Sequence, residues 1–165
     1  MTRMPVALLG IAILALLMGA QGSKDRIGDA YPLTICPISQ RPLGPNPITL
    51  ITEGMDSADM NGRELKFCCG GCQNRFLADA KVNLAKLDEM IVKDQMKLYP
   101  DANCIVMPDD ELTDPRGPEA MSEKNEVIGN RLYRFCCKAC IRRFKRNPGP
   151  YTSVLDKLVI EQQSE

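Results

Sequence analysis

The sequence contains no histidine and no tryptophan, and its aromatic residues are limited to four Tyr and four Phe among 165 residues. Without histidine the chain cannot form a Cys–His or Ser–His nucleophilic pair, and no zinc site can use imidazole ligands. Any transition-metal site must therefore use sulfur, with help from carboxylates. Because large side chains are scarce, each small unit would bury a modest core and would depend on disulfides or a bound metal.

The sequence also lacks an excess of charge, with 21 Lys and Arg against 21 Asp and Glu. This balance gives no general attraction to nucleic acid or to acidic lipid, so we expect no nucleic-acid partner. No phosphate-binding glycine loop, catalytic triad or paired-carboxylate site is present, and we expect no enzymatic activity. The acidic segment 109–111 lacks the ligand spacing of a calcium loop, so we interpret it as a solvated loop.

The N-terminal segment has the pattern of a targeting sequence. Arg3 precedes an uncharged run from Val6 to Ala20, which is short for a membrane span and suits the apolar core of a signal peptide. Residues 1–22 are therefore predicted to be a signal peptide, with cleavage after Gly22 or after Ala20. We expect a bacterial protein exported to the periplasm or the exterior. The alternative is an uncleaved N-terminal membrane anchor, the one case in which the chain would contact the membrane.

An internal repeat organises the remainder of the chain. All eight cysteines fall into two sets of four that are related by a constant offset of 68 residues, and several aromatic, proline and arginine positions share this register. We predict a tandem duplication, with repeat one at residues 30–97 and repeat two at residues 98–165. The first set is Cys36, Cys68, Cys69 and Cys72, and the second is Cys104, Cys136, Cys137 and Cys140.

The local patterns predict an α+β fold for each repeat. The first cysteine lies on a knuckle-like turn, which is followed by a β-hairpin (strands 47–52 and 63–67 in repeat one). The three clustered cysteines come at the end of the second strand and lead into one helix, and a second helix follows at 80–96 or 151–163. Neither repeat is joined to the other by a Gly/Ser linker.

The cysteine positions favour a metal site in each repeat. The first cysteine precedes the clustered three by 32 to 36 residues, a separation that suits a hairpin between two ligand-bearing elements. A thiolate at a helix N-terminus is stabilised by unpaired N–H groups and by the helix dipole, and metals bind thiolates. Four thiolates would suit zinc, and two or three would suit Cu(I).

Two other interpretations of the cysteines stay open. An even number of cysteines in an exported small domain is typical of structural disulfides, although the adjacent Cys68 and Cys69 do not readily pair with each other. The motifs Cys69-x-x-Cys72 and Cys137-x-x-Cys140 also resemble a thioredoxin-like redox pair. That motif is expected in a longer βαβ context and without two extra thiols.

The motif Phe67-Cys68-x3-Cys72-x3-Phe76, which recurs from Phe135 to Phe144, resembles the YHS/TRASH metal-binding domains. The resemblance covers nearly the whole chain after the targeting segment. It implies a small treble-clef-like zinc finger in each repeat and a role in heavy-metal trafficking, resistance or sensing. It also implies that the four motif phenylalanines pack beside the sites.

The chain departs from this family at the knuckle. Ser39 stands where the family often has a second knuckle cysteine, and Met107 stands at the equivalent place in repeat two. The extra Cys69 and Cys137 would supply the missing ligand. The Met107 thioether would favour Cu(I), or Met107 would simply fill a gap in the core.

We therefore expect an exported heavy-metal-binding protein that holds about one Zn²⁺ or Cu⁺ in each repeat. Its expected partners are the soft metal ion and a periplasmic or membrane protein. The alternatives are an interaction protein with purely structural cysteines and, less favoured, a thiol oxidoreductase. The helix of repeat two is basic from Lys138 to Arg146, which we interpret as a solvated face or as a surface for an acidic partner. The candidate ligands are Cys36, Cys68, Cys69, Cys72, Cys104, Cys136, Cys137, Cys140 and Met107.

Overall fold

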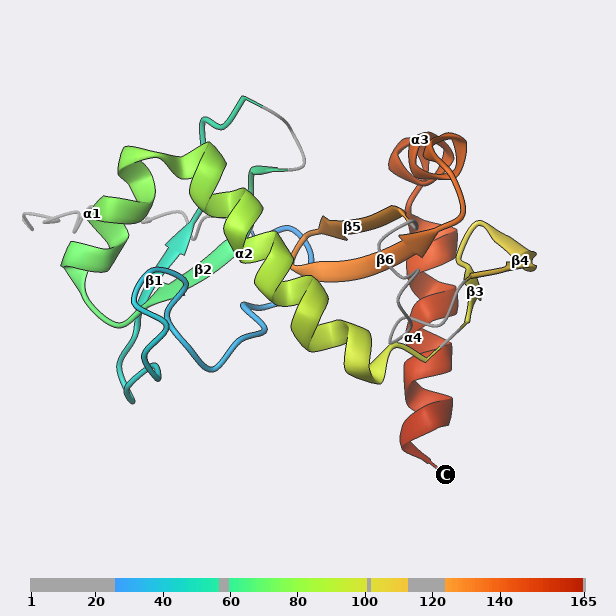
Figure 1. The fold of residues 1–165 in the computed structure, drawn as a ribbon, viewed down its shortest axis with the longest axis horizontal. Helices are drawn as coiled ribbons and strands as arrows, with labels where there is room; N and C mark the ends of the chain where they lie inside the picture. Colours follow the sequence, from blue (N-terminus) through green and yellow to red (C-terminus); the bar gives the residue numbers. More distant parts are fainter. Residues whose placement is uncertain (1–25, 57–59, 101, 113–123, 165) are drawn as a thin grey trace, which may run out of the picture.

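The computed structural model of the chain describes residues 26–56, 60–100, 102–112 and 124–164. Within these residues the fold is α+β, with three two-stranded antiparallel hairpins and four α-helices (Figure 1). The predicted signal peptide at 1–22 lies outside the described residues. In the described part of the chain, none of the helices combines the length and apolar character that crossing a bilayer requires.

The elements of the first repeat follow the predicted order. The strands pair in antiparallel register, with Ile48 opposite Phe67, and the first helix begins three residues after the second strand ends. A single residue, Asp79, separates the two helices, and its carboxylate caps the second one by accepting from the Val82 N–H. The elements are β1 (Ile48–Ile51), β2 (Glu64–Phe67), α1 (Gly70–Ala78), α2 (Ala80–Gln95) and the short 3₁₀ helix η2 (Met96–Leu98).

The second repeat has the same plan with one additional hairpin. A two-stranded pair forms at its knuckle, where Cys104 lies opposite Met107. The main hairpin again ends at the phenylalanine before the cysteine pair, since Lys124 lies opposite Phe135. The elements are β3 (Asn103–Cys104), β4 (Met107–Glu111), β5 (Lys124–Ile128), β6 (Arg131–Phe135), α3 (Lys138–Arg146) and α4 (Gly149–Gln163).

The two main hairpins differ in the connection between their strands. Gly129 and Asn130 both have positive φ, at 56° and 67°, which is the geometry of a two-residue type I′ turn. In the first repeat the strands are instead joined by the long connection from Thr52 to Arg63. The Asn61-Gly62 pair lies at the end of that connection, and Gly62 has the positive φ expected of a turn.

Each repeat has its own hydrophobic core between its hairpin and its helices. In the first, Leu84, Leu87 and Ile91 lie on one face of α2 and are completely or almost completely buried. In the second, the aromatic residues Tyr133, Phe135, Phe144 and Tyr151 cluster around α3 and the start of α4, and Leu155 closes the core. The hairpins and helices therefore converge on the region where the cysteines lie.

Helix α2 also joins the two repeats. It crosses from the first hairpin to the second and packs against both β5 and β6 (Figure 1). At this junction the Asn130 side chain is completely buried and donates hydrogen bonds to the backbone oxygens of Glu64, at 2.7 Å, and Asp29, at 3.3 Å. Arg63 Nε donates to Asn130 Oδ1 at 3.0 Å. The two halves thus share a buried polar contact as well as an apolar one.

Candidate metal centres

The first candidate centre, site 1, consists of Cys36, Cys68 and Cys72. Their three Sγ atoms all lie within 4.8 Å of one another. The Sγ atoms of Cys68 and Cys72 lie 3.7 Å apart. Two sulfurs bound at about 2.3 Å to one tetrahedral zinc ion lie about 3.8 Å apart, so this spacing already suits a shared ion. The triad therefore has the geometry to hold a metal.

The fold brings these three thiols together from distant parts of the chain. Cys36 lies on the knuckle turn, where its N–H donates to the Arg41 carbonyl and its carbonyl accepts from Gln40. Cys68 directly follows β2, and Cys72 lies in the first turn of α1. Because β2 leads into α1 across only two residues, Cys68 and Cys72 both lie close to the knuckle cysteine.

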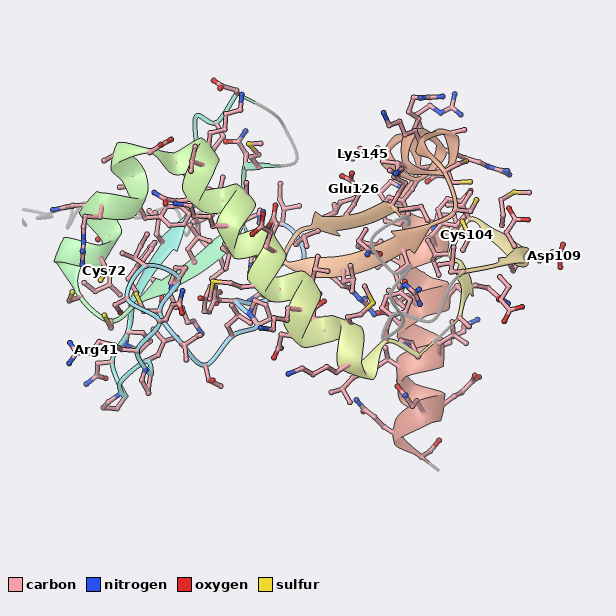
Figure 2. All side chains as sticks on the ribbon, in the orientation of Figure 1. Arg41, Cys72, Cys104, Asp109, Glu126 and Lys145 are labelled. Carbon is pink, nitrogen blue, oxygen red and sulfur yellow. The ribbon has the colours of Figure 1, made fainter. Side chains whose placement is uncertain are left out.

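The second candidate centre, site 2, repeats this arrangement with Cys104, Cys136 and Cys140. The three Sγ atoms again lie within 4.8 Å of one another, and Cys136 and Cys140 are 3.6 Å apart. Cys104 belongs to the short knuckle hairpin, near the exposed strand β4 that carries Asp109 (Figure 2). The two sites are thus built from equivalent positions of the duplicated sequence.

Burial and aromatic packing shield both sites from solvent on one side. Cys36 and Cys104 have no exposed surface, while Cys72 and Cys140 are also buried. In site 1 the Phe67 and Phe76 rings meet edge to face at 5.3 Å. The equivalent Phe135 and Phe144 rings meet at 5.5 Å, as the sequence motif implied. The rigid rings hold the strand end and the helix start in fixed positions.

Hydrogen bonds favour a thiolate at Cys36. Burial by itself raises the pKa of this thiol, but the Ser39 hydroxyl and the backbone N–H groups of Ser39, Cys68 and Ile38 donate to its sulfur and lower the pKa to about 6. Burial and the neighbouring thiols instead raise the pKa of Cys72 to about 11, although Arg75 donates to its sulfur at 3.5 Å. One charge on the knuckle thus opposes ionisation of its neighbours until a cation is bound.

Site 2 differs from site 1 in its polar neighbours. Burial, followed by a hydrogen bond to the Asp110 carboxylate, raises the pKa of Cys136. In site 1 the corresponding neighbour is the Ser39 hydroxyl, whose Oγ lies 3.4 Å from the Cys68 Sγ. Segment 109–111 is solvated as expected, with all three residues exposed, but it belongs to strand β4 and not to a loop, and its Asp110 also accepts a hydrogen bond from Cys136. This contact was not predicted from the sequence. The one available signal was that Asp110 follows the knuckle cysteine Cys104 by only six residues.

The structure places the extra cysteines outside the two triads. Cys69 and Cys137 are the N-cap residues of α1 and α3, and both are exposed. Each still lies beside its site, with 3.9 Å between the Cys69 and Cys68 sulfurs and 3.7 Å between those of Cys137 and Cys140. Backbone hydrogen bonds at the helix N-termini lower the pKa of both exposed thiols. Their role as ligands stays a prediction.

Met107 lies on β4 with its side chain 40 % exposed. The alternative in which this side chain fills a core gap is therefore wrong, since a residue with that exposure does not complete a buried core. The predicted ligand role of its thioether stays open as a prediction. All eight cysteines are free thiols in the structure.

Comparisons with protein-family models, with curated proteins and with solved structures find no match to this chain. The resemblance to YHS/TRASH domains thus depends on the motif residues alone. The geometry itself yields a coarser conclusion: the protein carries two cysteine triads, each arranged so that one metal ion could be held between its three sulfurs.

Proposed function

We propose that this chain is an exported heavy-metal-binding protein that holds one soft ion, Zn²⁺ or Cu⁺, in each triad and acts in metal trafficking, sequestration or sensing. One observation carries the proposal. In both repeats, three sulfurs that come from a knuckle, a strand end and a helix start lie within 4.8 Å of one another. The resemblance to YHS/TRASH domains and the predicted signal peptide support the biological part of the proposal.

A metal explains this grouping better than a disulfide does. Three thiols can form only one disulfide among themselves, and a second disulfide would need the exposed Cys69 or Cys137, whose sulfurs lie 3.9 and 3.7 Å from a sulfur of their triads. A metal ion uses all three sulfurs at once and neutralises the charge that develops as they ionise. The close grouping of three sulfurs from separate elements in both repeats therefore favours ligation.

The polar neighbours suggest that the two sites differ in metal preference. Three thiolates alone suit Cu(I), whereas zinc requires a fourth donor. In site 2 the Asp110 carboxylate touches the cluster and is a good zinc ligand. In site 1 the neighbour is the weaker Ser39 hydroxyl. We propose that site 2 favours Zn²⁺ and that site 1 accepts the softer Cu⁺ more readily.

A thiol oxidoreductase is the second candidate function, and one observation favours it. Cys137 is exposed, has a lowered pKa and lies 3.7 Å from the Cys140 sulfur, as an attacking thiol and its partner would. The other two sulfurs of this repeat, those of Cys104 and Cys136, have no role in a two-thiol cycle. A metal site gives all the clustered sulfurs one purpose, so we place the redox function second.

Elemental analysis of the protein purified from its exported location tests the proposal. We expect about two metal ions per chain and about one in either the Cys72→Ser or the Cys140→Ser variant. Thr49→Ser, a substitution on β1 outside the triads, is the control and retains both ions. Four disulfides without metal would contradict the proposal, and reversible thiol titration near the glutathione potential would favour the redox alternative.

A further inference from the structure

Helix α3 carries a concentration of positive charge that the rest of the chain does not share. Its nine residues include five basic side chains and no acidic one, whereas the whole chain has equal numbers of basic and acidic residues. All five are exposed, and nitrogen-tipped side chains project from α3 into solvent (Figure 2). The five basic residues are Lys138, Arg142, Arg143, Lys145 and Arg146.

The duplication provides an internal comparison for this charge. Helix α1 is the equivalent element of repeat one, with the same length and the same buried cysteine and phenylalanine positions, but it has a single basic residue, Arg75. The fold and the metal triad therefore do not require a basic helix. Lys145 forms an ion pair with Glu126 on β5 at 3.5 Å, which leaves most of the charge directed outward (Figure 2).

The basic helix begins at the exposed edge of site 2. Its N-cap is Cys137, whose exposed sulfur lies 3.7 Å from the buried sulfur of Cys140. A shallow hollow of about 440 Å³ on the same helix is lined by Ala139, Arg142, Lys145 and Arg146. A partner that docks against this hollow would thus have its own ligand groups next to the exposed thiol.

We propose that site 2 exchanges its metal with an acidic, thiol-bearing protein that docks on the basic face of α3, with Cys137 as the exposed sulfur through which the ion passes. The inference depends on the proposed function and deepens it. Site 1 has an equivalent exposed thiol in Cys69 but no basic helix, so it is the site that retains its ion in the presence of this partner.

The exchange is a sequence of ligand substitutions without electron transfer. Cys137 binds the ion as its thiolate, and one buried sulfur of the triad leaves. A partner thiol then gives its proton to water, binds the ion, and displaces Cys137. The ion keeps its oxidation state, and each displaced thiolate regains a proton from water. Repetition of this step moves the ion completely onto the partner's thiols.

An acidic protein fits this surface better than a membrane does. A lipid headgroup would neutralise the helix but would supply no sulfur to receive the ion. A protein with carboxylates around a pair of cysteines matches both the charge of α3 and the chemistry of the adjacent site. Complementary charge raises association rates by up to several powers of ten at low ionic strength.

The test uses the full mature chain loaded with Zn²⁺ and two synthetic acceptor peptides. Both peptides carry one Cys-x-x-Cys motif, flanked either by four Glu or by four Gln. Native mass spectrometry after timed mixing measures the zinc that has moved. We expect transfer of one ion per chain to be about tenfold faster to the Glu peptide at low ionic strength, with the difference falling as salt is added.

Two sets of variants locate the effect. Arg142→Glu with Arg146→Glu removes the preference for the Glu peptide while zinc stoichiometry stays at two. Lys81→Glu with Lys157→Glu, which makes the same change in net charge on exposed positions of α2 and α4, retains the preference. Cys137→Ser slows transfer from site 2 to both peptides, whereas Cys69→Ser leaves the fast-exchanging ion unaffected.

Equal transfer to the two peptides, or a preference that survives the α3 charge reversal, would overturn the inference while the proposed function stands. The inference fails in the same way if phosphatidylglycerol-containing vesicles bind α3 and the peptides are not distinguished. Protein that takes up no zinc or copper at either triad would overturn the proposed function and this inference together.

Discussion

At the scale of single residues, the two sites show how one change beside equivalent thiols alters their chemistry. The sulfurs occupy repeated positions, so the differences come from the groups that hydrogen-bond to them. Ser39 donates to Cys36 and lies 3.4 Å from the Cys68 sulfur. In the second repeat, Asp110 accepts from Cys136 and brings a carboxylate to the same region. A carboxylate is a harder donor than a hydroxyl and also carries charge, so metal selectivity should respond to it.

Replacement of Asp110 tests this difference. In Asp110→Asn the amide keeps the size of the side chain and loses its charge, so we expect zinc affinity at site 2 to fall by about 10- to 100-fold, the usual effect of losing a group that supports a metal site. Competition with a zinc chelator measures the affinity. Asp109→Asn, which changes the neighbouring carboxylate, is the matched control. An equal loss of zinc affinity in that variant would show that Asp110 has no specific role at site 2.

The Ser39 hydroxyl makes a separate prediction about pH. In the metal-free, reduced protein we expect the Cys36 thiolate to appear with a midpoint at about pH 6, because hydrogen bonds to its sulfur outweigh the effect of burial and lower its pKa to about that value. Ultraviolet absorbance of the thiolate follows the titration. Ser39→Ala removes a donor and moves this midpoint upward, toward the ordinary thiol value. Ser153→Ala, on the exposed surface of α4, should leave the midpoint unchanged. An unchanged midpoint in Ser39→Ala would contradict the hydrogen bond from Ser39 to Cys36.

At the scale of elements, the main hairpin and the two helices of each repeat were predictable because each has a strong local pattern, whereas the short β3–β4 hairpin was not predicted. The β-branched segment before Thr52 became β1, and Gly129 with Asn130 formed a tight turn. Segment 80–96 was predicted as a helix and became α2. The sequence could not show which of two adjacent cysteines faces the triad. That choice depends on the rotation of the backbone at the N-cap, and there Cys69 and Cys137 face outward.

The hairpin turn between β5 and β6 provides a test at this scale. Gly129 has a φ of +56°, and a Cβ added there would lie 2.8 Å from the Gly28 Cα. We expect Gly129→Ala to lower the free energy of unfolding by about 1 to 3 kcal/mol, since both the backbone and the contact become strained. Urea unfolding measures the change. Gly149→Ala at the start of α4 meets nothing within 4 Å and is expected to be neutral or stabilising, so equal losses would contradict the argument.

At the scale of the whole molecule, the duplication did not produce two independent units. Helix α2 packs against β5 and β6 of the second repeat, and Val127 of that repeat joins the first core. The 68-residue register alone did not indicate this packing between repeats. Such contacts depend on the direction in which a long helix such as α2 extends beyond its own repeat. The Gln95 side chain at the end of α2 illustrates the coupling, since it donates to the Asn130 carbonyl and accepts from the Leu132 N–H.

Buried Arg63 is the residue through which this coupling is best tested. Its guanidinium, with a side chain only 2 % exposed, forms an ion pair with Asp88 of α2 at 2.7 Å and donates to Asn130 of the second repeat. The equivalent Arg131 forms the corresponding ion pair with Asp156 but has a side chain 15 % exposed, and its other acidic partner, Asp29, is 3.9 Å away.

We expect Arg63→Ala to destabilise the protein by about 2 to 3 kcal/mol, because it removes a buried guanidinium from its ion pair with the partly exposed Asp88 and leaves the buried Asn130 oxygen without this donor. Arg131→Ala should cost about 1 kcal/mol, because its partners are largely solvated. Urea unfolding of the metal-free protein, followed by circular dichroism and by tyrosine fluorescence, measures both. In a Tyr31→Phe background the remaining three tyrosines all belong to repeat two and report on that half. A single shared transition that shifts in Arg63→Ala would then show that the repeats unfold together. If the tyrosine signal kept its midpoint in that variant, the two halves would be independent, and the buried junction would have no role in holding site 2.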